Sequence, residues 1–297
     1  MISRRSFLFK GAMGAVAAGA PWLAKAAPQS LGANCGVQLW VLRKLMEKDF
    51  NGTLAKVAAI GITQVEFAGF YGQTASQVRT SLSMAGLRAA GAHCIAADDS
   101  DEQIKHTIDF CAEAGIHYVI AAEPARKTPS PDNDVFRHIE LSDWQWSADR
   151  FNAIGVWAHG AGLRFGYHNH NIDFLQYGNV VAFDEVIRIT DPALVAIEFD
   201  FGNAAAAGID PYHYLAKYPH RFELAHVKEW AAPFEPTFTI DFPKYAPFGS
   251  GMTDWSKLLT TLDAAGIRDI FIEQDGTAAG HELEAVRQAY GYLKTVV

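Results

Sequence analysis

A short motif recurs along this chain and limits what the chain can fold into. The motif ends in Ala or Ile, then Gly, then Ile or Leu. It occupies residues 59–62, 84–87, 113–116, 160–163 and 264–267. Each segment follows apolar residues at helical spacing and precedes a short apolar run. A glycine at this position takes the left-handed conformation that ends a helix, and the next apolar residue begins a strand. The repeat therefore predicts alternating helices and parallel strands.

Eight strand–helix pairs are expected from this alternation and from the spacing of the apolar residues. The predicted strands are residues 36–40, 64–67, 88–94, 118–121, 164–168, 195–200, 223–227 and 270–274. The predicted helices are residues 50–60, 75–85, 101–114, 142–160, 180–189, 211–217, 255–264 and 281–293.

Eight such pairs in about 260 residues predict an α/β fold, a closed (β/α)8 TIM barrel in a single domain. The alternative is an open doubly wound sheet, but no glycine-rich phosphate loop follows the first strand. Two insertions are longer than the other connections, residues 124–141 and 230–253. The second is rich in Pro and Phe, and we expect it to lie over the barrel mouth as a lid or to form a subunit contact.

The first 26 residues are predicted to be an export signal, which leaves the barrel to residues 27–297. The pair Arg4-Arg5 resembles a twin-arginine signal, and Ala24-Lys25-Ala26 fits a small-x-small cleavage site. The alternative is a membrane anchor, but the apolar run of about 13 residues is shorter than the roughly 20 that span a bilayer. We therefore expect a periplasmic protein with no stable membrane insertion after cleavage.

The chain is acidic, with a formal charge of −8. The first 26 residues hold four bases and no acid, so the remainder carries 21 bases and 33 acids, a net charge of −12. Affinity for a phosphate backbone depends on Lys and Arg, and the charge therefore argues against nucleic acid as a partner. Three cysteines are too few for a disulfide framework, and we interpret them as small buried residues.

Polar residues gather at the predicted carboxyl ends of the strands, where the active site of a TIM barrel lies. Residues two apart in a strand share a face, so several of these residues point the same way. The set comprises Glu66, His93, His168, His170, Glu198, Asp200, Asn203, His226, Lys228 and Glu273.

Carboxylates at inward positions of a barrel need a partner, because an unpaired buried carboxylate costs several kcal/mol. Any one of these residues could be a hydrogen-bonded interior polar group. Asp200, His226 and Glu273 together favour a divalent cation, since carboxylate oxygens and a neutral imidazole complete its coordination shell. The absence of cysteine from this set favours Mn²⁺, and Mg²⁺, Co²⁺ or Zn²⁺ would also fit.

Four motifs in order carry a resemblance to a known family. They are GYHNHNIDF at 166–174, the segment 197–230 containing IEFDFGN and HVKEW, FGSGMTDWSKLL at 248–259, and FIEQDG at 271–276. Together they resemble the sugar phosphate isomerase/epimerase superfamily of xylose isomerase-like TIM barrels, over nearly the whole mature chain. The resemblance implies one metal held by Glu, Asp, His and Glu from strands five to eight.

Three residues match this implied ligand set: Asp200, His226 and Glu273. His168 falls where the fifth-strand Glu would lie, so the chain departs from the pattern of the epimerases. Those enzymes resemble two-base machines in which both glutamates exchange protons with the substrate. The His-x-His sequence of His168 and His170 is closer to the inosose dehydratase branch, and whether His168 or His170 is the fifth-strand ligand stays open.

The chemistry that the resemblance implies is removal of a proton next to a carbonyl whose charge the metal stabilises. The candidate bases are Glu273, His168 and His170, because a histidine titrates near neutral pH. Lys228 and Asn203 are expected to donate hydrogen bonds to the substrate, and Lys228 is also a candidate catalytic residue.

The opposite wall of the site is predicted to hold His93 and Glu66. Trp40 and Phe70 are candidate faces for stacking a sugar ring, or else plain packing residues. No cluster of arginines accompanies the last two strands, so we expect a neutral sugar, polyol or keto-glycoside.

The leading hypothesis is a metal-dependent isomerase or epimerase acting on a small-molecule carbohydrate. A dehydratase or lyase of the inosose dehydratase or 3-keto-glycoside type on the same site is the alternative. An endonuclease-type hydrolase is disfavoured by the charge of −12. A non-catalytic exported sugar-binding protein is disfavoured by the predicted ligand set, and a homo-oligomer is possible.

Overall fold

The computed structural model describes residues 34–128, 138–232, 234–239, 242–274, 276 and 280–296. The predicted signal peptide lies outside these residues, as does part of the insertion at 124–141. Among the described residues, no helix combines the length and the apolar character needed to cross a bilayer.

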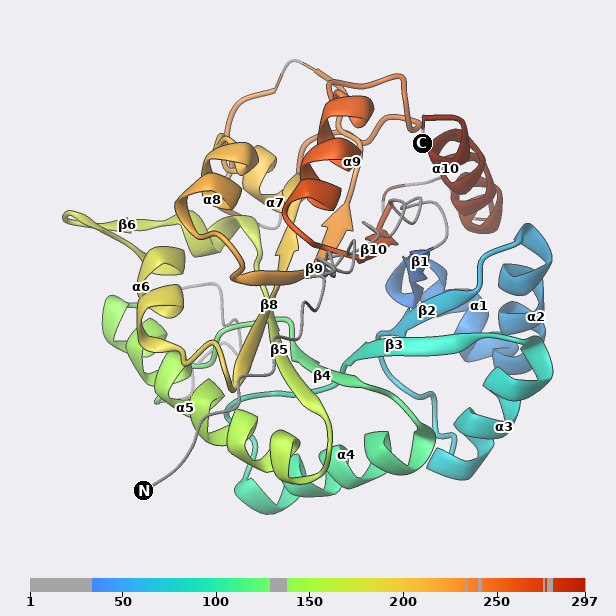
Figure 1. Ribbon diagram of the computed structural model, residues 1–297, viewed down its shortest axis with the longest axis horizontal. Helices are drawn as coiled ribbons and strands as arrows, with labels where there is room; N and C mark the ends of the chain where they lie inside the picture. Colours follow the sequence, from blue (N-terminus) through green and yellow to red (C-terminus); the bar gives the residue numbers. More distant parts are fainter. Residues whose placement is uncertain are drawn as a thin grey trace, which may run out of the picture.

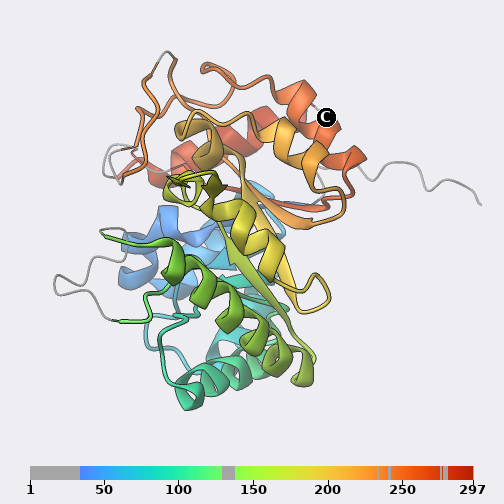
Figure 2. The same cartoon turned by 90° about the vertical axis from the view of Figure 1, so that its left-hand side faces the viewer.

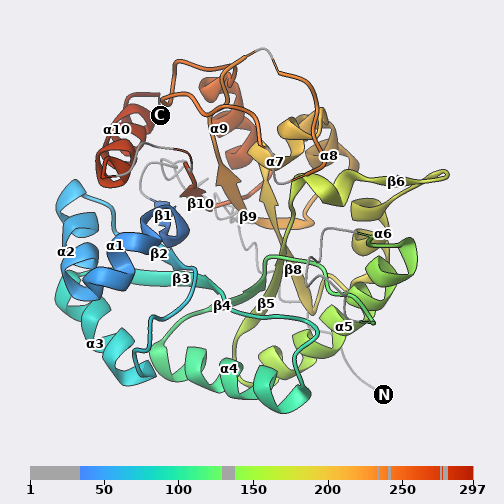
Figure 3. The ribbon, with the colours of Figure 1, turned by 180° about the vertical axis from the view of Figure 1, so that it is seen from behind.

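Eight parallel strands close into a barrel, and helices surround it (Figures 1 and 3). Around the barrel the order is β1, β2, β3, β4, β5, β8, β9 and β10, and β10 pairs with β1. The strands are β1 (Cys35–Gln38), β2 (Gln64–Phe67), β3 (Arg88–His93), β4 (Tyr118–Ala121), β5 (Arg164–His168), β8 (Val195–Asp200), β9 (Phe222–Val227) and β10 (Asp269–Ile272). The predicted TIM barrel is thus confirmed.

The helices form the outer layer, and Figure 2 turns α5 and α6 towards the viewer. The helices that follow the barrel strands are α2 (Phe50–Ile60), α3 (Ala75–Ala85), α4 (Asp101–Ala114), α5 (Leu141–Gly160), α6 (Ala182–Ile189), α8 (Pro211–Lys217), α9 (Trp255–Ala264) and α10 (Glu282–Val296). The last of them, α10, packs beside α2, the first of these helices, and so completes the ring.

The glycines of the recurring motif have the conformation that the sequence predicts. Gly61, Gly86 and Gly115 follow directly on α2, α3 and α4 with φ of 99°, 67° and 78°. Gly162 and Gly266 also have positive φ, and each comes two residues after its helix. These turns reverse the chain so that each strand runs parallel to the one before.

Several short elements lie outside the prediction. They are the 3-10 helices η2 (Leu39–Leu42) and η3 (Asn171–Phe174), the helices α1 (Arg43–Lys48) and α7 (Phe201–Ala206), and the hairpin strands β6 (Gln176–Tyr177) and β7 (Val180–Val181). The prediction of a helix over 180–189 is wrong at its start. Gly178 turns the chain with φ of 64°, and Val180 pairs with Tyr177 before α6 begins at Ala182.

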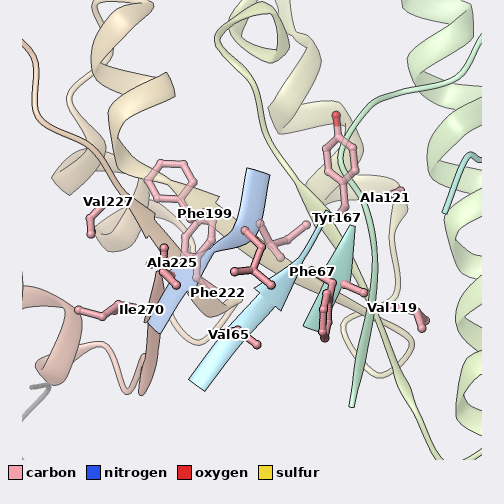
Figure 4. Packing of buried hydrophobic residues seen from close by; sticks show 14 of the residues in the cluster. Val65, Phe67, Val119, Ala121, Tyr167, Phe199, Phe222, Ala225, Val227 and Ile270 are labelled. Carbon is pink, nitrogen blue, oxygen red and sulfur yellow. The ribbon is translucent and has the colours of Figure 1, made fainter. Parts of the chain in front are cut away.

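Two apolar clusters hold the barrel together. The larger lies between strands and helices, and Figure 4 shows side chains of alternate strand residues such as Val65 and Phe67 within it. The smaller lies on the opposite face of the strands, inside the barrel, and consists of Ala90, Leu224 and Phe271 with Tyr118 packed against it. On β2, β5, β8 and β9, the inward positions that follow towards the carboxyl ends hold the ionisable residues Glu66, His168, Glu198, Asp200 and His226.

The cysteines are free thiols. Cys35 and Cys111 are buried and Cys94 is half-buried, with its sulfur 3.7 Å from the sulfur of Cys111. Their burial fits the interpretation as packing residues.

Candidate metal and substrate site

The four residues that the sequence proposes as metal ligands come together at the carboxyl ends of four neighbouring strands. One donor atom each of His168, Asp200, His226 and Glu273 lies within 4.8 Å of every other, and all four residues are buried. His168 ends β5, Asp200 ends β8, His226 lies near the end of β9, and Glu273 follows β10. The register of β8 and β9 sets Asp200 directly beside His226.

Hydrogen bonds with neighbouring residues fix the position of Asp200. It caps α7, with Oδ1 accepting a hydrogen bond from the Asn203 backbone N–H at 2.8 Å. The Asn203 side-chain Nδ2 donates to the Asn169 carbonyl oxygen at 3.0 Å, and Asn169 Oδ1 accepts from the Asp200 N–H at 2.9 Å. Asn203, predicted to contact the substrate, is buried in α7, where it orients Asp200.

Lys228 brings a positive charge to the two carboxylates of this group. Its Nζ lies 3.0 Å from Asp200 Oδ2 and 3.0 Å from Glu273 Oε2. Its stem packs on Gly202, where a Cβ would come within 2.6 Å of Lys228 Cβ. Burial alone would lower the pKa of Lys228, but Asp200 and Glu273 raise it well above its usual range. The side chain is therefore an ammonium.

Beneath these ligands lies a layer of buried carboxylates and imidazoles. Glu198 Oε2 lies 2.8 Å from His93 Nε2, 3.1 Å from His168 Nδ1 and 3.2 Å from His226 Nε2. Glu66 Oε2 lies 2.7 Å from His226 Nε2 and 3.1 Å from His93 Nε2. The donor atoms of His93, His168, Glu198 and His226 form a second group within 4.8 Å of one another.

The charges of this layer compensate one another. Burial would lower the pKa of His93, but Glu66 and Glu198 raise it to about 9. Burial would raise the pKa of Glu198, but His226 and the hydrogen bond from His168 hold it well below its usual range. For His168, burial and the nearby charge of His226 lower the pKa well below the usual value, so this imidazole is neutral.

A cavity of about 330 Å³ opens above the ligands at the barrel mouth. Four of the predicted site residues besides the ligands line it: Trp40, His93, His170 and Lys228. Trp40 is 44% exposed, and the guanidinium of Arg43 lies 4.3 Å above the ring. Burial lowers the pKa of His170 to about 4, with the charge of Lys228 adding to the effect, so His170 is neutral near pH 7.

Three predicted substrate contacts lie elsewhere. The described lining does not include Glu66, Phe70 or Asn203. Glu66 is fully buried below the cavity, one inward position deeper than Ala68, which lines it. Phe70 would share the face of Ala68 if the strand continued, but Gly69 with φ of 114° breaks the alternation. Its ring packs on Phe67 and Phe110 instead.

Described residues of the insertion 230–253 form a roof over the cavity, which was one of the two roles predicted for the insertion. Phe238, Thr239, Phe242 and Tyr245 line the cavity from this segment. Asn171 holds the segment to η3, since its Nδ2 donates to the carbonyl oxygens of Thr237 and Thr239, each at 2.9 Å. The abundance of Pro and Phe was the sequence signal for a roof, but the individual contacts were not predicted.

Glu229 fixes the far end of the roof. This fully buried carboxylate accepts hydrogen bonds from the backbone N–H groups of Gly249 at 3.0 Å and Thr253 at 3.1 Å. Trp255 Nε1 also donates to it at 2.6 Å. Glu229 directly follows Lys228, so one short stretch of backbone places both the roof and the cavity lysine.

The group His168, Asp200, His226 and Glu273 suits a divalent cation. Two imidazoles and two carboxylates are ligands that Zn²⁺, Co²⁺ and Mn²⁺ accept. Asp200 Oδ2 is buried, pairs with the Lys228 ammonium at 3.0 Å and lies 3.7 Å from His168 Nε2. That separation is too long for a hydrogen bond but close to the edge of a metal coordination shell, about 3.4 Å for a tetrahedral site.

Comparison with known proteins assigns the family. The sequence profile described as Xylose isomerase-like TIM barrel matches residues 54–296. The chain belongs to this family. The superfamily resemblance seen in the four sequence motifs is thus confirmed at the level of the family.

Two curated relatives have the same name. Inosose dehydratase of Geobacillus thermodenitrificans is 26% identical over 273 residues, which covers 84% of this chain and 90% of the relative. Inosose dehydratase of Clostridium beijerinckii is 25% identical over 279 residues, with the same two coverages.

Solved structures agree on the fold. A sugar phosphate isomerase/epimerase from Parabacteroides distasonis superimposes with a TM-score of 0.71 at 23% identity, covering 88% of this chain and 93% of that chain. The IOLI protein, whose structure has a bound zinc atom, superimposes with a TM-score of 0.65 at 14% identity, covering 89% of this chain and 98% of its own.

Proposed function

We propose that this protein is a divalent-metal-dependent lyase that removes water from a keto-polyol or keto-sugar. The observation that carries the proposal is the cluster of His168, Asp200, His226 and Glu273, with the Lys228 ammonium 3.0 Å from both carboxylates. His168 and Glu273 line the cavity, and Asp200 and His226 are buried beside them. The inosose dehydratase relatives support lyase chemistry in particular. Isomerase or epimerase chemistry, the leading sequence hypothesis, becomes the second candidate.

The four clustered residues would hold the metal. When bound, it would polarise the substrate carbonyl and stabilise the negative charge that develops after proton removal. Mn²⁺ remains the predicted ion, and two imidazoles also suit Zn²⁺ or Co²⁺. The zinc atom in the structure of the IOLI protein, which has the same fold, supports the proposal of a divalent ion.

The residues above the ligands supply the proton transfers. His170 lines the cavity, lies outside the ligand cluster and is neutral, so it serves as the base. It takes the proton from the α-carbon and returns it to the leaving hydroxyl, so that one water forms and no net proton is gained. The Lys228 ammonium donates a hydrogen bond to the oxygen that becomes negative.

The histidine on β5 favours elimination over epimerisation. Epimerisation by two bases needs a proton acceptor on each face of the reacting carbon. A β5 glutamate would supply one of them, but His168 occupies that place, and its two nitrogens lie 3.1 Å from Glu198 Oε2 and 3.7 Å from Asp200 Oδ2. Elimination needs only the base that His170 provides.

Epimerisation keeps a specific observation in its favour. Glu273 and His170 both line the cavity and could work as a pair of bases from two sides. The two reactions leave different products, so one experiment separates them.

The cavity lining points to a neutral substrate. The cationic side chains of the described lining are Lys228 and His93, and this lining contains no arginine. We therefore propose a neutral keto-polyol, keto-sugar or keto-glycoside as the substrate and do not expect a nucleic acid or a phosphate ester.

The test uses the purified full chain loaded with Mn²⁺, Co²⁺ or Zn²⁺ and incubated in D₂O with a keto-inositol and with 3-keto-glucosides. Dehydration lowers the product mass by one water, whereas epimerisation keeps the mass apart from exchanged deuterium. Loss of water that needs the metal and falls at least about 100-fold in His170→Gln supports the proposal. Exchange without loss of water supports the epimerase, and inertness with every metal contradicts both and favours the sugar-binding protein.

Export is a separate proposal. We propose that residues 1–26 direct the chain to the periplasm through the paired arginines Arg4 and Arg5. Fractionation of cells that express the full chain tests this. Arg4→Lys/Arg5→Lys should retain the chain in the cytoplasm, and export that is unchanged in this variant would contradict the twin-arginine route.

A further inference from the structure

Two buried carboxylates of the site belong neither to the described cavity lining nor to the ligand cluster. Glu66 and Glu198 are fully buried, and both lie beneath the ligands in contact with histidine nitrogens. The proposed lyase chemistry uses neither of them. Keeping two carboxylates buried at this depth is costly, which calls for a role that offsets the cost.

The two ligand histidines stand between this lower layer and the ligand carboxylates, in opposite orientations. His226 places Nδ1 2.8 Å from Glu273 Oε2 and Nε2 2.7 Å from Glu66 Oε2. His168 places Nε2 3.7 Å from Asp200 Oδ2 and Nδ1 3.1 Å from Glu198 Oε2. The nitrogen that faces up is therefore Nδ1 on one ring and Nε2 on the other.

A carboxylate that binds no metal can only accept a hydrogen bond, so the ring nitrogen that faces it carries the proton. On His226, Nε2 faces Glu66 at 2.7 Å and Glu198 at 3.2 Å, whereas Nδ1 faces Glu273, a member of the ligand cluster whose oxygen would bind the metal instead. A ring nitrogen that carries a proton cannot bind a metal. We infer that Glu66 and Glu198 are positioning residues that assign the ligating atoms, Nδ1 on His226 and Nε2 on His168. The inference rests on the proposed metal site and adds the two outer carboxylates that orient it.

Glu66 is itself fixed on the remaining sides. Gln38 Nε2 donates to Glu66 Oε2 at 2.7 Å, and Gln38 Oε1 accepts from the Trp40 backbone N–H at 3.0 Å. Gly91 on β3 leaves the room that the carboxylate needs, because a Cβ there would lie 2.7 Å from Glu66 Oε1. These contacts hold the Glu66 carboxylate in one position, which a residue that orients a histidine ring needs.

The rival arrangement is a second metal in the lower layer, bound by His93, His168, Glu198 and His226 through the other nitrogens. The spacing of the atoms favours the upper cluster. In the lower layer the nitrogens and carboxylate oxygens already lie at hydrogen-bond distances of 2.7–3.2 Å. In the upper cluster, His226 Nδ1 and Glu273 Oε2 are 2.8 Å apart, but His168 Nε2 and Asp200 Oδ2 are 3.7 Å apart and share no hydrogen bond, which leaves a wider gap between two candidate ligands.

Cadmium is the probe for the test, because ¹¹³Cd couples to the ¹⁵N nucleus that binds it. The ¹⁵N-labelled full chain is titrated with ¹¹³Cd²⁺, and the coupled nitrogens are assigned by NMR. We expect one cadmium per chain, coupled to Nδ1 of His226 and Nε2 of His168. Coupling to Nε2 of His226, or two cadmium ions per chain, would overturn the inference, and this measurement needs no variant.

A variant pair tests the orienting role itself. Glu66→Gln should lower cadmium affinity by about 10- to 100-fold and weaken the coupling to His226 Nδ1. Glu185→Gln is the matched control, since Glu185 is also a buried carboxylate but lies on α6 and contacts Gln145 and Arg188 rather than a ligand. It should leave affinity and coupling unchanged even if thermal stability falls.

The outcomes separate the two proposals. A wild-type chain that binds no cadmium removes the metal site and the proposed function with it. A wild-type chain that binds one cadmium through the expected nitrogens, with Glu66→Gln equal to wild type in affinity and coupling, overturns the orienting role alone.

Discussion

The interior of this barrel has two halves of opposite chemistry. Towards the amino ends of the strands it is filled by Ala90, Leu224 and Phe271, whereas towards the carboxyl ends it holds buried acids, histidines and a lysine. On β9 the change takes one step of two residues, from Leu224 to His226. The first half gains stability from buried apolar surface. In the second half, the burial of charge costs stability. We therefore expect substitutions in the two halves to alter stability and chemistry separately.

The largest expected effect lies in the charged half. In Asp200→Ala/His226→Ala, two of the four clustered ligands are lost, and the metal content of the purified protein should fall from about one ion per chain to near zero. The loss should exceed the roughly 100-fold that removal of an outer partner costs. Mass spectrometry of the metal content measures it, with circular dichroism as the control for folding. A variant that keeps its metal would show that the ion binds elsewhere.

The apolar half should respond in the opposite way. Phe271 is fully buried and packs at 5.8 Å, edge to ring, against His226. Phe271→Ala should lower the free energy of unfolding by about 3–5 kcal/mol, because it removes a buried ring and leaves a cavity. Metal affinity of the folded protein should stay within a few-fold of wild type. Denaturant unfolding and a metal titration test this, and loss of metal binding at full folding would break the division into two halves.

A buried acid outside the ligand cluster sharpens the contrast. Burial raises the pKa of Asp173 to about 8, although Tyr167 and the His170 N–H hydrogen-bond to it. The folded chain therefore keeps a proton that the unfolded chain releases above about pH 4. Stability from this group falls as pH rises from about 4 to 8 and is level above it, by at most about 1.4 kcal/mol per pH unit.

Asp173→Asn mimics the protonated acid and should remove this dependence. The difference in unfolding free energy between the variant and the wild type should grow in favour of the variant from pH 5 to pH 8. Urea unfolding at several pH values measures it. A difference that is constant across this range would mean that Asp173 is ionised in the folded protein.

Lys228 tests the balance of charge within the site. Its ammonium shares Asp200 and Glu273 with the proposed metal. In Lys228→Met, which keeps the length of the apolar stem, the two carboxylates lose a competing cation, and metal affinity should rise. A tenfold gain corresponds to about 1.4 kcal/mol. Competition with a chelator measures it, and a fall in affinity would mean that the lysine supports the ligands rather than competing with the ion.

The smallest effect is expected at the amino end of the barrel. Arg164 Nε donates to Glu223 Oε2 at 3.3 Å, in a partly exposed ion pair. Glu223→Gln should change the free energy of unfolding by less than about 1 kcal/mol, because exposed ion pairs are screened by water and salt. Thermal unfolding at low and high salt tests this. A larger loss would show that the amino end also depends on charge.

The fold was accessible from the sequence because its signals are local. The strands β2, β4, β5 and β8 have the predicted bounds, as do the helices α2, α3, α4, α8 and α9. Glycine turns and apolar spacing act over a few residues, so a sequence displays them directly. The short helix α7 escaped because six residues that include Gly202 give too little periodicity.

The candidate site was accessible in part. The period of two in a strand predicts that Glu198 and Asp200 point inward together, but it does not show depth. Only the packing of the barrel puts Asp200 among the ligands and Glu198 one layer below, next to Glu66. For Phe70 the sequence left sugar stacking and plain packing open, and after the left-handed turn at Gly69 its ring packs on Phe67 and Phe110.

Glu229 has a consequence for redesign of this barrel. It anchors the segment that roofs the cavity, and its backbone neighbour Lys228 reaches the proposed ligands. If the roof were replaced by that of another barrel, Glu229 would lose its hydrogen-bond donors unless Gly249, Thr253 and Trp255 were transferred as well. The roof of the cavity and the position of the Lys228 charge would therefore have to be transferred together, as the segment 228–255.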